Sequence, residues 1–416
     1  MLPFIISAIK IIVLLGVLIT IHELGHFMIA KLCKVKVNEF AIGFGPAIWQ
    51  KQGKETKYTL RLIPLGGYNA MEGEDEVSEH ERAFSKASIP KRIAIVLAGA
   101  VVNILFAIII YFIVISTSGT YLSNQIENVL DGYAAQTVGL QAGDKILEAN
   151  GTTIKSKKDI DKLLEESKGK EIKAKIERNG QVQEFSIVPS EIKSKVTGIY
   201  LDEKCKIIAV EKGSSSEKQG IQANDKLLKV NGTEINGDRN IALQEISKED
   251  VNIMTLTVQR GNDEITIELE PDYAYHYYLG VTMQPAEDTF INRCIYGGMQ
   301  TQEFLLSIID NLKQLFTGNV GIDQMMGPVG ISEVVAKTNG VREFFEMMAL
   351  ISLSLGVTNL LPIPALDGGK ILILLIEAIR RKPMKPETEI NIQLLGFSIL
   401  IALSIYVTYH DILRIF

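Results

Sequence analysis

Cysteine is scarce in this sequence, and its scarcity excludes a disulfide-stapled fold. The three cysteines, Cys33, Cys205 and Cys294, are odd in number and far apart, so no cysteine metal site is indicated either. An excess of positive charge is also missing, because 43 Lys and Arg stand against 49 Asp and Glu, a formal net charge of −6. We therefore expect no nucleic-acid-binding surface.

Charge is also missing from long apolar stretches near both ends of the chain, whereas the middle has the mixed composition of a soluble protein. A transmembrane helix needs about 20 mostly apolar residues. We expect four such helices, at 1–30, 93–116, 345–379 and 391–412. The first continues too far past any cleavage site to be a signal peptide. The predicted fold class is therefore an α-helical membrane protein with four transmembrane helices.

Basic residues flank these spans unevenly. The segment 31–92 holds 11 Lys and Arg, and the turn after the third span carries four more between 380 and 385. Because Lys and Arg favour the cytoplasmic side, we expect both connections in the cytoplasm. The N-terminus and the middle of the chain are then extracytoplasmic.

The middle of the chain contains an internal repeat. Residues 142–154 align with 223–235, and eight of the 13 positions are identical. Asn179-Gly180 and Gly261-Asn262 occupy matching places and predict hairpin turns. Each copy resembles a PDZ domain, which implies two inserted α/β domains, expected at 122–190 and 196–271. PDZ domains bind extended peptides by strand addition, and here peptide binding and a size-excluding spacer both remain open.

A segment at 294–330 follows the repeat and has apolar residues at helical spacing. Such a pattern is typical of an amphipathic helix that lies along the membrane surface.

The main chemical signal is His22-Glu23-Leu24-Gly25-His26, at the far end of the first span. Residues four apart share one face of a helix, so both imidazoles can ligate one zinc ion with Glu23 beside it. Ionisable groups at membrane depth are costly, and a bound cation offsets that cost. The alternative is a polar cap where the helix leaves the bilayer.

A third metal ligand is predicted in the third span, since catalytic zinc takes three protein ligands. Asp367 is the only acid in the middle of that span, and Pro362 and Pro364 interrupt the helix before it. Broken backbone at membrane depth is tolerated where it is buried or lines a cavity. The alternative is a simple kink in which Asp367 pairs with Lys370.

Together the motifs resemble the site-2 protease family of intramembrane zinc metalloproteases, and more narrowly its bacterial members similar to the regulator of sigma E protease. The resemblance rests on the His-Glu-Leu-Gly-His run, the tandem PDZ-like modules and three further stretches, which are Gly43–Pro46, Ile63–Tyr68 and Asn359–Gly368. Where the family has Ala-Gly-Pro before an Asn in the second span, this chain has Ala98-Gly99-Ala100 before Asn103.

This resemblance implies that His22, His26 and Asp367 ligate Zn²⁺ and that Glu23 is the general base. It further implies regulated intramembrane proteolysis in the bacterial plasma membrane, with the active site near the cytoplasmic side. The substrates are then transmembrane segments of proteins such as anti-sigma factors, or signal-peptide remnants. Two other functions stay open from the residues alone, a metal transporter and a non-catalytic PDZ-containing receptor.

Substrate-binding residues are predicted at three positions. A β-hairpin in the first cytoplasmic loop, built from 47–50 and 57–63, can accept a substrate strand at its edge, and we place Tyr58 and Leu60 there. Asn359 is expected to donate to the substrate backbone, and an interhelical hydrogen bond is the alternative. The same two readings apply to Asn103.

Overall fold

The computed structural model describes residues 2–74, 78–118, 121–202, 204–248, 252–316 and 326–415. It divides into two compact units. Met1–Gly119 and Thr289–Phe416 form one, called the helical unit below, and Thr120–Asp288 forms the other, called the middle unit. Both ends of the chain therefore build the helical unit, and the middle unit is inserted between them.

Three helices of the helical unit are long and apolar: α1 (Leu2–Leu32), α2 (Ile89–Ser118) and α11 (Pro386–Ile415). Their most apolar parts have mean hydropathies of 2.5, 3.0 and 2.0. Within the described ranges, these three helices are the ones long and apolar enough to cross a membrane, judged by length and composition.

The expected third span is two helices instead of one. α9 (Gly340–Asn359) and α10 (Asp367–Arg380) are separated by a turn over 360–366. Pro362 and Pro364 lie in that turn, where proline removes a backbone donor and restricts the residue before it. The break predicted inside 345–379 is therefore a complete turn, and the count of four spans remains a prediction.

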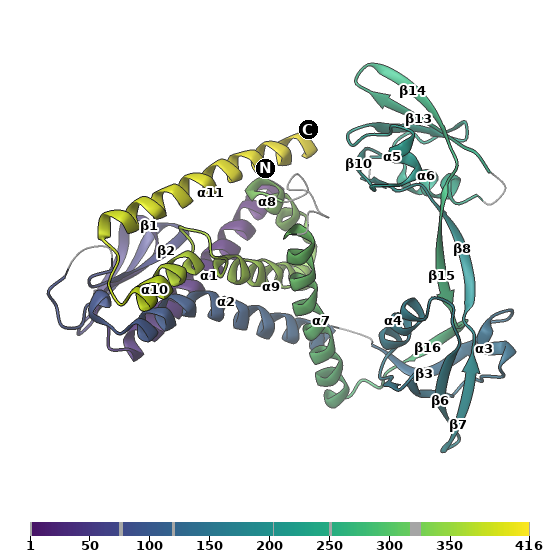
Figure 1. Ribbon diagram of the computed structural model, residues 1–416, viewed down its shortest axis with the longest axis horizontal. Helices are drawn as coiled ribbons and strands as arrows, with labels where there is room; N and C mark the ends of the chain where they lie inside the picture. The colour runs from purple at the N-terminus through teal and green to yellow at the C-terminus, as the bar shows by residue number, and fades with distance from the viewer. Residues whose placement is uncertain are drawn as a thin grey trace. The chain divides into compact units, whose positions relative to one another are not determined.

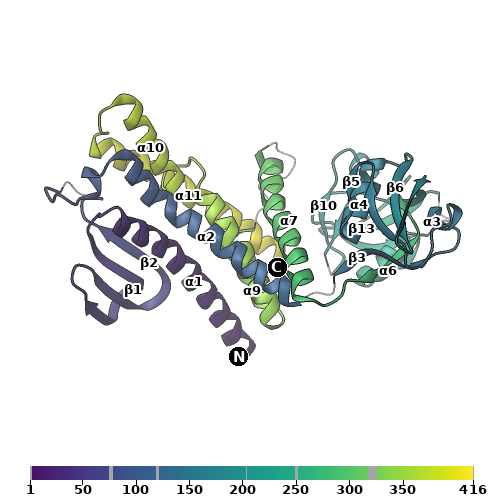
Figure 2. The same ribbon diagram turned by 90° about the horizontal axis from the view of Figure 1, so that it is seen from below.

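Helix α2 lies between α1 and α9, as Figures 1 and 2 show. Glycines allow these helices to approach closely. A β-carbon at Gly25 of α1 would lie 2.6 Å from the Ala98 carbonyl oxygen, and one at Gly356 of α9 would lie 2.8 Å from that of Ala100. Small residues are typical of such close contacts in membranes. Both contacts fall on the Ala-Gly-Ala segment of α2.

Charged side chains hold both ends of the short helix α8 (Pro328–Lys337). At its N-terminus, Asp411 of α11 accepts hydrogen bonds from the backbone N–H groups of Gly327 (3.2 Å) and Gly330 (2.8 Å). At its C-terminus, Lys10 of α1 donates to the Thr338 carbonyl oxygen at 2.7 Å. The two charges match the helix dipole, so α8 connects α1 to α11.

The predicted hairpin is present and longer than expected, with β1 at Val37–Gln52 and β2 at Lys57–Met71. Both strands bend, so that each residue of 57–60 has one partner in 49–52 and another in 39–42. Residues 39–42 also pair with 67–70, and Val37 pairs with Met71. The result is a sheet of four segments in the order 49–52, 57–60, 39–42 and 67–71. The segments 49–52 and 67–71 form its edges.

Helix α7 (Phe290–Phe316) covers most of the described part of the expected amphipathic segment 294–330. Its Phe304 ring stacks on Tyr111 of α2, with ring centroids 4.1 Å apart. Residues 317–325 lie outside the described ranges.

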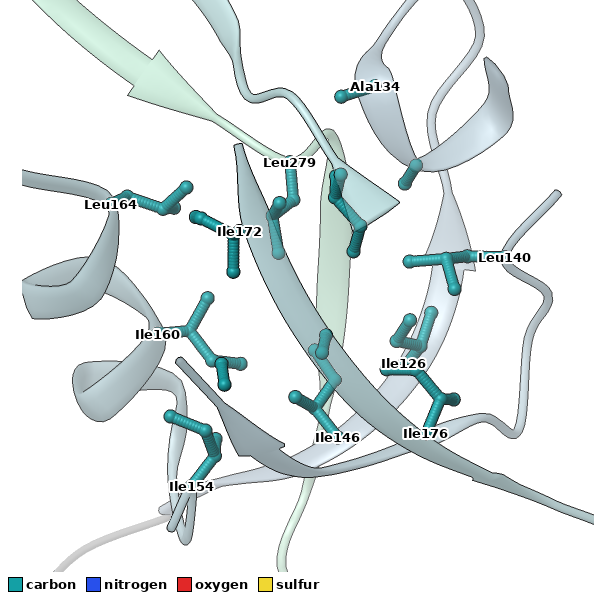
Figure 3. Packing of buried hydrophobic residues seen from close by; sticks show 14 of the residues in the cluster. Ile126, Ala134, Leu140, Ile146, Ile154, Ile160, Leu164, Ile172, Ile176 and Leu279 are labelled. Atoms are coloured by element: carbon teal, nitrogen blue, oxygen red, sulfur yellow. The ribbon is translucent and has the colours of Figure 1, made fainter. Parts of the chain in front are cut away.

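The first module of the middle unit begins with β3 (Leu122–Val129), α3 (Ala134–Thr137), β4 (Lys145–Ala149) and β5 (Thr152–Thr153). It continues with α4 (Lys157–Ser167), β6 (Ile172–Arg178) and β7 (Gln181–Ile187). Its sheet has the order β16-β3-β4-β6-β7. Figure 3 shows how Ile160 and Leu164 of α4 face Ile146 and Ile172 of the sheet.

The second module repeats this pattern with β9 (Ile199–Leu201), β10 (Ile207–Val210), α5 (Ser215–Lys218), β11 (Lys226–Val230) and β12 (Thr233–Glu234). It ends with α6 (Arg239–Ile246), β13 (Met254–Arg260) and β14 (Asp263–Leu269). The strands β12-β11-β13-β14 form one sheet, and β9 pairs with β10. Both predicted two-residue hairpins are present, because Arg178 pairs with Gln181 and Arg260 with Asp263.

The first module is completed by residues that follow the second. β8 (Ser190–Val196) pairs with β15 (Asp272–Tyr278), and β16 (Val281–Pro285) then pairs with β3. Leu279 and Met283 belong to the core of the first module. The range 122–190 therefore lacks one strand of its sheet, and the second module is nested inside the first. The pairing is long-range, so the repeat pattern alone did not reveal it.

Each module contains an equivalent ion pair between a buried aspartate and an arginine. In the first, Asp144 accepts two hydrogen bonds of 2.7 Å from Arg178 and one of 2.9 Å from the Gln141 N–H. In the second, Asp225 accepts bonds of 2.8 and 2.7 Å from Arg260. Both aspartates are almost fully buried, at 1% and 2% exposure. This pair explains why the repeat keeps an Asp after its Gly-x-Gln segment and an Arg before its hairpin turn.

Candidate metal centre

Helix α1 places the two imidazoles on one face. The Nε2 atoms of His22 and His26 lie 3.1 Å apart, and their rings meet edge to face with centroids 4.7 Å apart. Asp367, the first residue of α10, faces them from the other half of the chain. Its Oδ2 atom lies 3.3 Å from Nε2 of His22 and 3.6 Å from Nε2 of His26. The three residues predicted as metal ligands are therefore together.

The three ligand atoms fit a zinc ion. Tetrahedral zinc with bonds of about 2.0–2.1 Å separates its ligand atoms by about 3.3 Å, and the three separations here are 3.1, 3.3 and 3.6 Å. The Oδ2 atom of Asp367 is buried and has no hydrogen-bond donor among the described residues. A buried carboxylate oxygen needs a compensating partner, and a divalent cation at this point supplies one.

Groups of helix α2 contact the Nδ1 nitrogen of each imidazole. The Nδ1 atom of His26 lies 2.8 Å from the Ile95 carbonyl oxygen, which can only accept, so this nitrogen carries the proton. The Nδ1 atom of His22 lies 3.3 Å from the side-chain amide nitrogen Nδ2 of Asn103. Asn103 is fully buried, and Ser352 of α9 donates to its backbone carbonyl at 2.9 Å. Both Nε2 atoms are thereby directed towards Asp367.

Gly99 leaves the space that the imidazoles fill. A β-carbon at this position would lie 2.4 Å from Nε2 of His26 and 2.8 Å from Cε1 of His22. Any larger residue would displace one of the rings. The residue after it is Ala100, where the resembled family has Pro, and the geometry of the site depends on the glycine.

The Leu-Asp-Gly-Gly run of α10 also has a steric explanation. A β-carbon at Gly368 would lie 2.2 Å from the Leu361 carbonyl oxygen, and one at Gly369 would lie 2.3 Å from that of Ile363. The turn over 360–366 therefore folds tightly onto the first residues of α10. This packing sets where the Asp367 side chain leaves the helix.

Glu23 lies between the two histidines in sequence and faces the hairpin. A β-carbon at Gly67 of β2 would lie 3.5 Å from Cγ of Glu23. Further along, one at Gly16 of α1 would lie 2.7 Å from the Pro64 carbonyl oxygen. Residues 64–67 of β2 thus run beside α1 up to the metal centre.

Two of the predicted substrate-binding residues do not lie at the sheet edge where we expected them. Tyr58 pairs with both Phe40 and Lys51, and Leu60 pairs with both Ile42 and Trp49, so neither residue lies on a free edge. The edge beside Glu23 is 67–71. Asn69 on that edge was missed by sequence reasoning, and both atoms of its buried amide lack partners in the described part of the chain. A lone Asn in a strand gives no local signal of this kind.

Asn359 ends α9, one turn before the tight fold over α10. Its side chain is half-buried and makes no hydrogen bond to any residue that the structure describes. Neither the substrate role nor the interhelical bond is therefore decided by its contacts.

A cavity of about 830 Å³ adjoins Asp367 and is lined by α10, the start of α11 and the segment after β2. Two ion pairs stand in its wall, Lys370 with Glu74 at 2.6 Å and Arg92 with Glu377 at 2.9 Å. Lys370, considered above as a partner for Asp367, thus binds Glu74, while the Oδ2 atom of Asp367 faces the histidines. Of the three proposed metal ligands, Asp367 is the one that lines this cavity.

Comparison with known proteins finds relatives along nearly the whole chain. Residues 10–403 match the sequence profile of peptidase family M50. A Clostridium acetobutylicum protein assigned by name to the zinc metalloproteases is 30% identical, over 95% of this chain and 94% of its own length. The regulator of sigma E protease of Haemophilus influenzae is 28% identical, over 97% and 98%. A crystal structure of the HtrA3 PDZ domain aligns with 21% of this chain and 94% of that domain, at 20% identity and a TM-score of 0.19.

Proposed function

Because this chain belongs to peptidase family M50, the site-2 protease family, it is an intramembrane zinc metalloprotease, and we propose that His22, His26 and Asp367 hold its zinc ion. The observation that carries this proposal is the convergence of three ligand atoms, within 3.6 Å of one another, from two distant parts of the chain. Three protein ligands leave one position open, as catalytic zinc requires.

Zinc and Glu23 have different roles in peptide hydrolysis at this site. When bound, zinc acts as a Lewis acid that polarises the scissile carbonyl and acidifies the attacking water. The Glu23 carboxylate takes the proton from that water and then delivers it to the leaving amide nitrogen. Its position next to His22 on α1 supports this role, since a general base must lie within hydrogen-bond reach of the water.

Asn103 and the Ile95 carbonyl select the tautomer of each ligand. A histidine that binds metal through Nε2 carries its proton on Nδ1 and donates it to a second group. For His26 that group is the Ile95 carbonyl oxygen. For His22 it is the Asn103 side-chain amide, whose nitrogen lies 3.3 Å from Nδ1. An amide nitrogen cannot accept a hydrogen bond, so metal binding through Nε2 of His22 requires the amide to turn its oxygen towards Nδ1.

The substrate segment binds as an extended strand along the edge 67–71 of the hairpin sheet. A helical segment must unwind before its carbonyls can be attacked, and an unpaired sheet edge supplies replacement hydrogen bonds. The nearness of Gly67 to Glu23 supports this edge, because a peptide bound there would lie close to the base. The unpartnered Asn69 amide and the Asn359 side chain bind the substrate backbone. Tyr58 and Leu60, about 36% and 38% exposed, contribute side-chain contacts only.

The first module has a groove suited to a peptide ligand. A cavity of about 420 Å³ lies between α4 and the chain around Gly280, and it is lined by Leu130, Ile160, Leu164 and Met283. PDZ-like modules add an extended peptide at such a place. Exclusion of bulky substrates by the whole middle unit is compatible with this role.

The proposal extends to the membrane topology and to the substrate class. The turn between α9 and α10 interrupts a third span, α11 is the fourth, and the hairpin lies on the cytoplasmic side, as the basic residues of 31–92 favour. The protein resides in a bacterial membrane. Its substrates are transmembrane segments of regulatory proteins, consistent with the name of the Haemophilus influenzae relative, or signal-peptide remnants.

One experiment tests the function directly. Parent protein and Glu23→Gln are purified in detergent, supplied with zinc, and incubated with a transmembrane peptide whose products are identified by mass spectrometry. The proposal expects cleavage by the parent and none by Glu23→Gln, with equal zinc content in both. Equal cleavage by the two proteins would exclude Glu23 as the base. Zinc binding with no cleavage by either would instead support transport or a receptor.

A further inference from the structure

The peripheral helix α11 touches the turn that precedes Asp367 at two points. The side-chain oxygen of Gln393 accepts a hydrogen bond of 2.6 Å from the backbone N–H of Ala365. One helical turn later, a β-carbon at Gly396 would lie 2.3 Å from the Pro364 carbonyl oxygen. The glycine thus lets the backbone of α11 come close enough for Gln393 to reach the turn.

Ala365 needs this support more than its neighbours do. Its φ of +73° is in the left-handed region, which residues with a β-carbon rarely adopt. Its N–H lies in the irregular backbone between α9 and α10, which the proposed topology places in the membrane, where an unpaired donor is costly. The Gln393 oxygen supplies the acceptor that stabilises this conformation.

The conformation of this turn also affects the position of Asp367 in the metal centre. Ala365 is two residues before Asp367, and Leu366 between them is the N-cap of α10. Because Gly368 and Gly369 pack so closely against the turn that a β-carbon at either would lie 2.2 or 2.3 Å from one of its carbonyl oxygens, the turn and the start of α10 move together. The distances between a metal ion and its ligand atoms lie within about 0.2 Å of their preferred values. A change in the conformation of Ala365 therefore reaches the Asp367 carboxylate.

We infer that Gln393 is a positioning residue that ties α11 to the third metal ligand, so that breaking its bond to Ala365 weakens zinc binding and slows hydrolysis. The inference rests on the proposed role of Asp367. It links α11, held at its other end through Asp411 and α8, to the state of the active site.

The test measures zinc affinity by competition with a chelator, together with kcat and KM, for the full-length protein in detergent. Gln393→Leu should bind zinc about 10- to 100-fold more weakly, as outer-shell changes do, and should lower kcat more than KM. Gln393→Glu keeps an acceptor oxygen and should stay within about threefold of the parent. Asn391→Leu makes the same kind of change at an exposed position of α11 and should have no effect.

A rescue distinguishes positioning from general stability. Glycine adopts a positive φ without steric cost, so adding Ala365→Gly to Gln393→Leu should recover zinc affinity at least in part. Parental zinc affinity and kcat in Gln393→Leu would overturn the inference, as would a loss that Ala365→Gly fails to relieve. Asp367→Ala is measured alongside. If that variant also binds zinc like the parent, the proposed metal site fails, and not merely the role of Gln393.

Discussion

Gly99 of α2 faces His26 of α1 so closely that a β-carbon at position 99 would lie 2.4 Å from the Nε2 atom of the imidazole. The ligand geometry thus depends on a residue with no functional group. The two helices approach here because Gly25 and Gly99 both lack side chains.

Gly99→Ala should therefore weaken metal binding while the helices remain folded. The added methyl group must displace one imidazole, and a site with misplaced ligands loses at least about tenfold in metal affinity. Zinc content by mass spectrometry and peptide cleavage check this prediction. Gly298→Ala in α7 is the matched control, because its β-carbon meets nothing within 4 Å. Parental zinc affinity in Gly99→Ala would contradict the packing described for the site.

Asn103→Leu should weaken zinc binding by about 10- to 100-fold, since His22 loses the group that fixes its tautomer. Asn103→Asp keeps an oxygen that can accept from Nδ1 of His22 and should retain most of the affinity. Chelator competition measures both variants. Equal affinities for Leu and Asp would show that Asn103 acts only in helix packing.

Asn69→Leu should raise the KM for a transmembrane peptide by about fivefold, the effect of one lost hydrogen bond of about 1 kcal/mol. Zinc affinity should stay parental, because the Asn69 amide makes no hydrogen bond to His22, His26 or Asp367. Steady-state kinetics with peptides of increasing length test this. An unchanged KM would place the substrate elsewhere than on the edge 67–71.

The Asp144–Arg178 pair makes the middle unit sensitive to acid. Burial alone would raise the pKa of Asp144, but the hydrogen bonds from Arg178 and from the Gln141 N–H outweigh it and lower this pKa below its usual value. A carboxyl with a lowered folded pKa stabilises the protein above its unfolded pKa of about 3.9, and this stability is lost as pH falls through the folded pKa. The thermal midpoint of the middle unit should thus fall steeply below about pH 4.

Asp144→Asn should remove much of that pH dependence and destabilise the unit at pH 7 by about 2 kcal/mol, because the buried position loses the charged acceptor of the hydrogen bonds from Arg178. Asp161→Asn, which breaks the exposed pair with Lys157, is the control and should cost less than about 1 kcal/mol. Calorimetry between pH 3 and 7 separates the two. An Asp144→Asn protein as stable as the control would contradict the importance of the pair.

The grouping of the three proposed metal ligands could be predicted from the sequence because their signals are local. His22 and His26 are four residues apart on one helix, and Asp367 is a lone acid beside a proline break. Gly99 and Asn69 gave no such signal, since their importance depends on which residue of a distant segment lies opposite. The same holds for β16, whose partner β3 lies more than 150 positions earlier. Long-range pairing and close helix contact are set by the packed core, which a local pattern does not encode.

Zinc stoichiometry is the most direct test of the account. Elemental analysis of the purified parent and of His22→Ala, His26→Ala and Asp367→Ala compares bound zinc per chain at equal protein concentration. The account predicts one zinc ion in the parent and almost none in each variant. One full equivalent of zinc retained by Asp367→Ala would contradict it.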